Sequence, residues 1–248
     1  MKNKYGAKKP ESLRLRFHTQ TAGVSLTAQE PENNIVRVTL QGLAAVLGGT
    51  QSLHTNSFDE ALCLPTENAV KIALRTQQII AHESGVADTV DPLAGSYYVE
   101  WLTNKMEEEA EHYFERIDEF GGVIPAIKAN FFQKEIANAS YRYQKEVEAH
   151  ERIIVGVNDF KLREPCSTPL LKIDEEVAKE QIARLNKVKS ERNNEKVKEA
   201  LSNLKEAAQG TDNLMPYIIK AIREYASIGE IISTLKDVFG TYIEDSIY

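Results

Sequence analysis

The chain has 248 residues, of which 42% are hydrophobic and 27% charged, and its net charge is −7. These totals suit one large domain, or one domain with an appendage, and they provide enough apolar residues for a core. Mixed acidic and basic residues argue against a nucleic-acid-binding surface, and no apolar run approaches the roughly 18 residues of a membrane span. The lysines of residues 1–10 precede no apolar signal-peptide core. Cys63 and Cys166 lack metal-binding spacing, so we expect free thiols in a reducing cytoplasm.

The first ninety residues predict short strands that alternate with helices. Strands are expected over 13–21, 51–57 and 86–90. Between them, one helix has an N-cap at Asn34 and ends at Gly48-Gly49, and a second runs from about Pro65 to Gly85. This strand–helix–strand–helix–strand order is typical of a parallel sheet with crossover helices.

From Tyr97 onward the predicted elements are mostly helical. We expect a glutamate-rich helix over 97–119, further helix over 123–150, a lone strand over 153–157, a linker over 161–173, a charged helical run over 174–208, and shorter helices at about 215–226 and 229–239. A solvated helix face explains the charged run better than a binding motif does. The predicted divisions are therefore 1–96, 97–160, the linker 161–173, and 174–248.

Two of the predicted strands end in nearly the same phrase, His18-Thr19-Gln20 and His54-Thr55-Asn56. Alternate side chains of a strand share a face, so His18 lies with Gln20, and His54 with Asn56. In a parallel barrel such residues would converge at the carboxyl ends of the strands, where ligands bind. The alternative is a hydrogen-bonded polar core. The repetition in two strands favours the ligand site.

The residues after the second strand leave two roles open. Asp59 and Glu60 could accept hydrogen bonds from ligand hydroxyls, or could cap the next helix. Gly48-Gly49-Thr50 could cradle a phosphate, but a helix C-cap explains it better. The sequence has no metal-ligand motif, no GxSxG nucleophile elbow and no GxxxxGK[ST] loop, so we predict no metal site.

Several long phrases carry a family resemblance. They are RFHTQTAGVSLTAQEPENNIVRVTLQGLAAVLGGTQSLHTNSFDEALCLPT at 16–66, TQQIIAHESGVADTVDPLAGSYYVE at 76–100, RIIVGVNDF at 152–160, and the helical segments at 174–239, with IGEIISTLKDVFG among them. Together they resemble the catalytic subunit of the methylmalonyl-CoA mutase family. The resemblance implies an α/β fold: the C-terminal portion of a TIM (β/α)8 barrel, about three βα units within 1–96, with barrel-associated elements over 97–160 and a helical extension over 174–248.

The resemblance also implies a coenzyme-B12-dependent acyl-CoA mutase and assigns roles to single residues. Positions that contact the acyl-CoA substrate correspond to His18, Gln20, Gln51 and Ser52. Positions at adenosylcobalamin correspond to Asn56 and Glu60, near the adenosyl group, and to Gly23, Ala61 and Leu64, against the corrin. In this family the cofactor supplies radical chemistry, while the protein orients the substrate and excludes water.

The sequence departs from the family's full pattern in two ways. It starts near the sixth barrel strand, so we expect the principal catalytic histidine to come from an N-terminal barrel portion, with no catalytic residue in this one. It contains no Asp-x-His-x-x-Gly motif for the lower cobalt ligand, so a separate cobalamin-binding subunit is expected. We therefore expect the isolated chain, a split subunit or a fragment, to be inactive, and the strand at 13–21 to have an unpaired edge. The alternatives are a non-catalytic assembly partner, or a mutase for isobutyryl-CoA or a hydroxyacyl-CoA.

Overall fold

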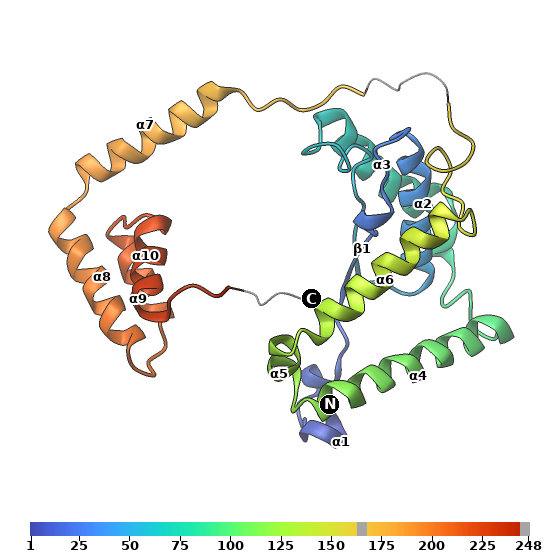
Figure 1. The fold of residues 1–248 in the computed structure, drawn as a ribbon, viewed down its shortest axis with the longest axis horizontal. Helices are drawn as coiled ribbons and strands as arrows, with labels where there is room; N and C mark the ends of the chain where they lie inside the picture. The colour runs from blue at the N-terminus through green and yellow to red at the C-terminus, as the bar shows by residue number, and fades with distance from the viewer. Residues whose placement is uncertain (163–167, 244–248) are drawn as a thin grey trace. The chain divides into compact units, whose positions relative to one another are not determined.

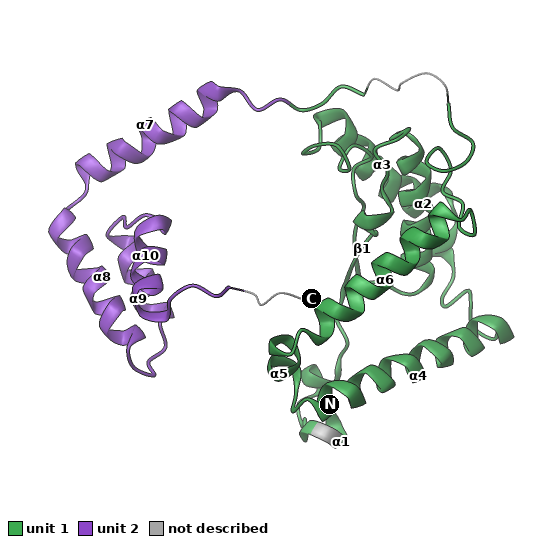
Figure 2. Ribbon diagram, viewed as in Figure 1, with its two compact units in different colours: residues 1–171 green, residues 172–248 purple. Residues whose placement is uncertain are grey.

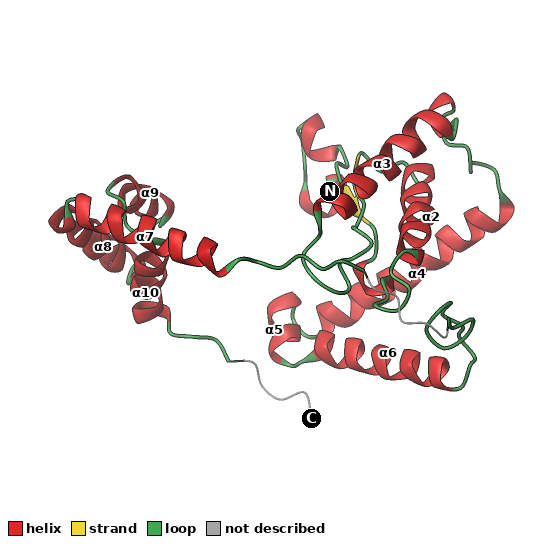
Figure 3. Cartoon of the chain, turned by 90° about the horizontal axis from the view of Figure 1, so that it is seen from above, coloured by secondary structure: helices red, strands yellow, loops and turns green. Residues whose placement is uncertain are grey.

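The computed structural model describes residues 1–162 and 168–243, and the chain divides into two compact units, 1–171 and 172–248 (Figure 2). The division falls inside the segment predicted as a linker, whereas the predicted boundary between residues 96 and 97 stays a prediction. Helices predominate in the described residues, and the strands are short (Figure 3). Cys166 lies outside the described residues, and no described helix is long and apolar enough to cross a membrane.

Unit 1 contains both strands of the structure and most of its helices. In chain order its elements are α1 (Lys2–Tyr5), η1 (Pro10–Leu13), β1 (His18–Gln20), η2 (Gly23–Ser25), α2 (Asn33–Leu47), β2 (Ser52–His54), α3 (Glu67–Glu83), η3 (Val86–Asp88), α4 (Tyr97–Glu119), α5 (Val123–Lys128) and α6 (Phe131–Glu148). The helix predicted over 97–119 is confirmed as α4. The helix predicted over 123–150 is interrupted at Asn130, whose φ of 56° is left-handed.

The strands β1 and β2 form a parallel pair that α2 connects and that lies beside α2 and α3 (Figure 1). His18 is opposite Ser52, and Gln20 is opposite His54. Gly42 allows α2 to approach, because a Cβ at this position would lie 3.2 Å from the Ile80 Cδ1 atom of α3. Within the described residues β2 is the single strand neighbour of β1, so the other edge of β1 has no strand partner.

Two predicted strands are wrong. Val86–Asp88 is a 3₁₀ helix, which follows a left-handed turn at Gly85. The stretch 153–157 forms no strand and has only the isolated bridge between Val155 and Asp159. There the Asn158 side chain accepts from the Ile154 N–H and donates to two backbone carbonyls, which holds the chain in a loop. The fold is thus a mostly helical α/β arrangement with a two-stranded parallel sheet, and its description as part of a TIM barrel stays a prediction.

The helix boundaries in unit 1 also correct two details. Asn34 is not the N-cap of α2, which begins at Asn33; its buried amide instead bonds to Thr27 and to the Phe58 carbonyl. The helix predicted from about Pro65 begins at Glu67 as α3, with Thr66 as its N-cap and Pro65 directly before it. At the other end of α2, Gly48 donates to the Ala44 carbonyl, which confirms the C-cap interpretation over a phosphate cradle.

Unit 2 is helical in all its described elements. They are α7 (Glu175–Glu191), α8 (Asn194–Ala208), α9 (Met215–Arg223) and α10 (Ile228–Phe239). The last three pack around the buried side chains of Ala200, Leu204, Ala221 and Ile231. The run predicted over 174–208 is therefore two helices, α7 and α8, with the break at Arg192 and Asn193.

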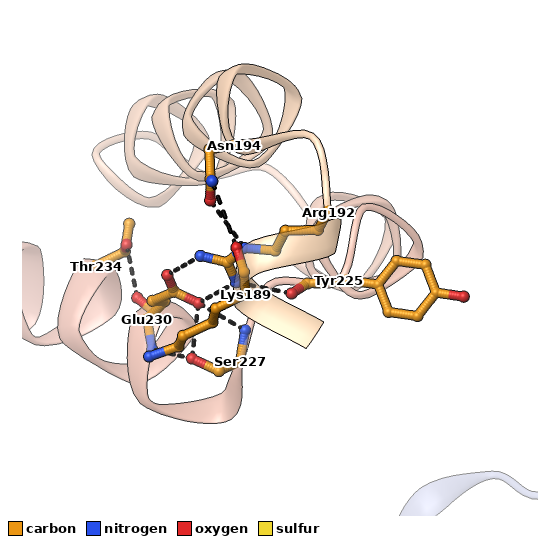
Figure 4. Close-up of polar contacts among 7 residues, drawn as sticks. All are labelled: Lys189, Arg192, Asn194, Tyr225, Ser227, Glu230 and Thr234. Atoms are coloured by element: carbon orange, nitrogen blue, oxygen red, sulfur yellow. Dashed lines mark hydrogen bonds and ion pairs between the residues drawn. The ribbon is translucent and has the colours of Figure 1, made fainter. Parts of the chain in front are cut away.

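The Arg192 side chain explains this break (Figure 4). It is 7% exposed, and its guanidinium donates to the Tyr225 carbonyl at 2.8 Å and to both carboxylate oxygens of Glu230. Glu230 also closes the capping box of α10 with Ser227. The Arg192 hydrogen bonds, followed by those from Ser227, hold the pKa of Glu230 well below its ordinary value. Arg192 therefore joins the α7–α8 junction to the start of α10.

Candidate functional site

The exposed face of the two-stranded sheet brings together the predicted substrate-binding residues. His18, Gln20, Ser52 and His54 all lie on this face, while Thr19 and Leu53 point to the partly buried side. Exposure excludes the polar-core alternative for His18, Gln20 and His54. The strands thus present a polar surface to solvent at their carboxyl ends.

Hydrogen bonds at the sheet hold three of the predicted substrate residues, His18, Gln51 and Ser52. The His18 Nδ1 atom lies 2.7 Å from the Ser52 Oγ atom, and the Phe17 N–H donates to the Gln51 Oε1 atom at 3.1 Å. Gln20 stands beside these residues, and its side chain has no hydrogen-bond partner within the described ranges. The imidazole of His18 is therefore held on one nitrogen, and the Gln20 amide remains able to bind a ligand.

A second network of hydrogen bonds, which is buried, lies just beyond the ends of β1 and β2. Thr21 donates its hydroxyl proton to the Asn56 Oδ1 atom at 2.6 Å, and the Asn56 backbone N–H donates to the Thr21 oxygen at 3.0 Å. Both residues are about 4% exposed. Asn56 is therefore buried beyond the end of β2 and does not share the exposed face of His54, contrary to the prediction from strand alternation.

Glu60 is bound to this network through both carboxylate oxygens. The Asn56 Nδ2 atom donates to Oε2 at 2.6 Å, and the Ser57 N–H donates to Oε1 at 2.6 Å. Because a carboxylate oxygen can accept more than one hydrogen bond, each oxygen retains acceptor capacity. Glu60 is half-buried, so part of the residue reaches solvent.

Asp59 has the helix-supporting role instead. It is fully buried, and its Oδ2 atom accepts from the Thr66 N–H at 2.9 Å and from the Thr66 hydroxyl at 2.8 Å. Thr66 in turn caps α3. The Asp59 Oδ1 atom is buried without a partner in the described part of the chain. Of the two adjacent carboxylates, only Glu60 is placed for a ligand.

The residues predicted to face the corrin are exposed and apolar or small. Gly23 adjoins the network, since a Cβ at this position would lie 3.6 Å from the Asn56 Nδ2 atom. Ala61 is exposed, and Leu64 is 62% exposed. Sequence reasoning missed two members of the network, Thr21 and Ser57. The position of Thr21, directly after Gln20 at a strand end, was the available signal.

The described residues contain no group of three His, Cys, Asp or Glu side chains that could hold a metal ion. The site therefore consists of an exposed polar strand face, a buried amide–hydroxyl network and a half-buried carboxylate beside small and apolar residues. Such an arrangement can bind hydroxyl and carbonyl groups of an organic ligand.

Comparisons with known proteins agree on one family. A family model described as "Methylmalonyl-CoA mutase" matches residues 1–241. The 2-hydroxyisobutanoyl-CoA mutase large subunit of Aquincola tertiaricarbonis is 45% identical over 250 residues, which cover 100% of this chain and 44% of the relative. The methylmalonyl-CoA mutase of Escherichia coli K12 is 46% identical over 243 residues, which cover 98% of this chain and 34% of the relative. The human mitochondrial methylmalonyl-CoA mutase is 43% identical over 237 residues, which cover 95% of this chain and 32% of the relative. The chain thus spans between 32% and 44% of the length of these relatives.

Proposed function

The chain belongs to the methylmalonyl-CoA mutase family, and we propose that it forms part of an adenosylcobalamin-dependent acyl-CoA mutase. The family resemblance expected from the sequence is thereby confirmed. The proposed reaction is the radical carbon-skeleton isomerisation of methylmalonyl-CoA to succinyl-CoA. Its proposed partners are an N-terminal barrel portion and a separate cobalamin-binding subunit. The first matched relative is itself named a large subunit.

The observation that carries this proposal is the Glu60 carboxylate, which is fixed by Asn56 and Ser57 yet retains acceptor capacity. The hydroxyls of an adenosyl ribose would donate to such a carboxylate. Gly23, Ala61 and Leu64 are exposed and small or apolar, as contact with a planar macrocycle would require. The chemistry of these residues therefore fits the cofactor. When bound, adenosylcobalamin would supply the radical that starts the rearrangement.

The exposed strand face would bind the acyl-CoA. Ser52 holds the Nδ1 atom of His18, which leaves Nε2 to hydrogen-bond a substrate oxygen. The free amide of Gln20 provides both a donor and an acceptor on the same face. Gln51 fixes the start of β1 through the Phe17 N–H. We assign these residues to binding and orientation, and none of them to the chemical step.

Native co-purification of the tagged chain from its source cells, with partners identified by mass spectrometry, tests the proposal. We expect an N-terminal barrel portion and a cobalamin-binding subunit, and mutase activity of the assembly with adenosylcobalamin. The isolated chain should be inactive with adenosylcobalamin and substrate. Activity of the isolated chain, or recovery of the chain without partners, would contradict the proposed assembly with an N-terminal barrel portion and a cobalamin-binding subunit. Recovery without partners would favour the alternative of a non-catalytic fragment or assembly partner.

A hydroxyacyl-CoA substrate is the second candidate. The specific support is the 2-hydroxyisobutanoyl-CoA mutase large subunit, whose similarity covers the whole chain. Assaying the assembly with methylmalonyl-CoA, isobutyryl-CoA and 2-hydroxyisobutanoyl-CoA separates these activities by their relative kcat/KM. A cytoplasmic location is also proposed, on the ground that the two cysteines are far apart in the sequence and lack metal-binding spacing.

A further inference from the structure

We propose that Thr21 is a positioning residue, which acts through Asn56 to fix the Glu60 carboxylate for an adenosyl-bearing ligand. The inference rests on the proposed function for the identity of that ligand. The coupling from Thr21 to Glu60 stands on the geometry of the chain itself. No substrate or cofactor atom needs to touch Thr21.

The Thr21 hydroxyl is committed to Asn56 in both directions. It accepts the Asn56 backbone N–H at 3.0 Å and donates its own proton to the Asn56 Oδ1 atom at 2.6 Å. The Asn56 backbone N–H occupies one lone pair of the hydroxyl, and the hydroxyl proton goes to the Asn56 Oδ1 atom. The hydroxyl therefore stabilises the Asn56 amide orientation in which Oδ1 points toward Thr21, and the Glu60 carboxylate, which only accepts, favours the same orientation.

That orientation determines what Glu60 meets. With Oδ1 directed at Thr21, the Asn56 Nδ2 atom faces the Glu60 Oε2 atom at 2.6 Å and donates to it. The reversed amide would place an oxygen against the carboxylate and replace a charge-assisted hydrogen bond with repulsion. Thr21 thus helps to hold the Asn56–Glu60 contact without taking part in it.

Backbone contacts hold Thr21 itself in place. The Thr21 N–H donates to the His54 carbonyl at 3.1 Å, which extends the β1–β2 pairing by one residue. The Thr21 side chain is 4% exposed. The Thr21 backbone is therefore held at the end of β1, while its hydroxyl binds Asn56 just beyond the end of β2. This arrangement is expected of a positioning residue.

A matched set of variants can separate this role from ordinary packing. Thr21→Val keeps the shape and removes the hydroxyl, whereas Thr21→Ser keeps the hydroxyl. Thr76→Val is the control, because Thr76 is 5% exposed and its hydroxyl bonds only to the Ile72 carbonyl of its own helix. If Thr21→Val does not fold, Thr21→Cys replaces the hydroxyl with a weaker donor of similar size.

The first readout is hydrogen exchange of single backbone amides in the full chain without ligand. We expect Thr21→Val to accelerate exchange at Ser57 about tenfold, because the Ser57 N–H is bonded to the Glu60 Oε1 atom and not to Thr21. Thr21→Ser and Thr76→Val should leave Ser57 within about twofold of the wild-type rate. Faster exchange at Asn56 alone, with Ser57 unchanged, would overturn the inference.

The second readout is binding of adenosylcobalamin and of hydroxocobalamin, which lacks the adenosyl group, to the assembly purified with its partners. Thr21→Val should weaken adenosylcobalamin about tenfold more than hydroxocobalamin, with rescue in Thr21→Ser. Equal losses for both cobalamins would reduce Thr21 to a packing role and overturn the proposal. If the wild-type assembly binds neither cobalamin, the proposed function fails, and the exchange of the Ser57 amide still decides the coupling.

Discussion

The two units use their polar side chains in opposite ways. In unit 2, Arg192 and Glu230 bind each other and the residues around them, and Glu230 accepts from Ser227 as well as from the guanidinium. In unit 1, Glu60 accepts one hydrogen bond on each oxygen, and the exposed strand face retains unused donors and acceptors. A polar cluster therefore indicates a ligand site only where hydrogen-bonding capacity remains after the fold is satisfied.

The largest effect is expected in the apolar core of unit 2. Leu204 is fully buried against Ala200, Ala221 and Ile231, so Leu204→Ala should lower the unfolding free energy of α8–α10 by about 3 kcal/mol. Peptide-resolved hydrogen exchange of the full chain measures this. Leu185→Ala on α7, where the side chain is 39% exposed, should cost less than about 1 kcal/mol. Equal losses would mean that the three helices do not depend on this core.

Arg192→Ala should give the next largest loss, about 2 kcal/mol at pH 7, because it leaves the 28%-exposed Glu230 side chain without its cation. The pKa of Glu230 is lowered in the folded chain. The stabilisation is therefore present above the unfolded pKa of about 4.3 and is lost as the pH falls below it. The wild type and Arg192→Ala should converge in acid, as measured by hydrogen exchange of α10.

Arg184→Ala provides the matched control for this prediction. Arg184 is an exposed arginine of α7, the helix that Arg192 directly follows, and its removal should change the stability of unit 2 by less than about 0.5 kcal/mol at any pH. If Arg184→Ala and Arg192→Ala behave alike, the charge of α7 matters and the Arg192–Glu230 contact does not.

How far the sequence predicts the fold differs between local and non-local features. Periodicity and caps predicted α4 to the residue, because an amphipathic helix is determined by its own sequence. The strands at 86–90 and 153–157 were wrong, because a strand exists only with a neighbour, and no pattern within the segment supplies one. The break at Arg192 was missed for the same reason, since its partner Glu230 lies 38 residues later.

The candidate site shows the same division. Strand alternation placed His18 and Gln20 on one exposed face, and the parallel pairing brought Ser52 beside His18. It failed for Asn56, which lies beyond the end of β2, where alternation no longer applies. The roles of Asp59 and Glu60 could not be separated from the sequence, because they depend on which carboxylate the loop turns toward Thr66.

Asn56→Asp should replace the hydrogen bond between Asn56 and the Glu60 carboxylate of unit 1 with repulsion between two carboxylates. The Asn56 Nδ2 atom lies 2.6 Å from the Glu60 Oε2 atom, so the substituted carboxylate would face another at that distance. We expect a loss of about 1–2 kcal/mol at pH 7 and a raised pKa for one of the two groups. A raised pKa makes the loss largest above that pKa and relieves it as the pH falls toward about 4.

Hydrogen exchange at Ser57 between pH 7 and pH 4, corrected for the intrinsic rate, measures that relief. Asn56→Asp should gain stability on acidification, whereas the Arg192–Glu230 contact of unit 2 is weakened below about pH 4. Asn138→Asp, on the exposed face of α6, should show no such gain. If Asn56→Asp is as stable as the wild type at pH 7, the Asn56 amide does not organise Glu60.

Ser52→Ala should have the smallest effect on stability. It should also separate the effect on folding from the effect on substrate binding most clearly. Ser52 is exposed, so removing its hydroxyl should change the unfolding free energy by less than about 0.5 kcal/mol. The His18 ring would lose its Nδ1 partner at 2.7 Å and its fixed orientation. In the assembled enzyme the KM for acyl-CoA should therefore rise about three- to tenfold. Ser190→Ala, whose hydroxyl bonds only to the Lys187 carbonyl, should change neither quantity. A loss of stability with an unchanged KM would assign the His18–Ser52 contact to folding, and the exposed face of unit 1 would then resemble the satisfied cluster of unit 2.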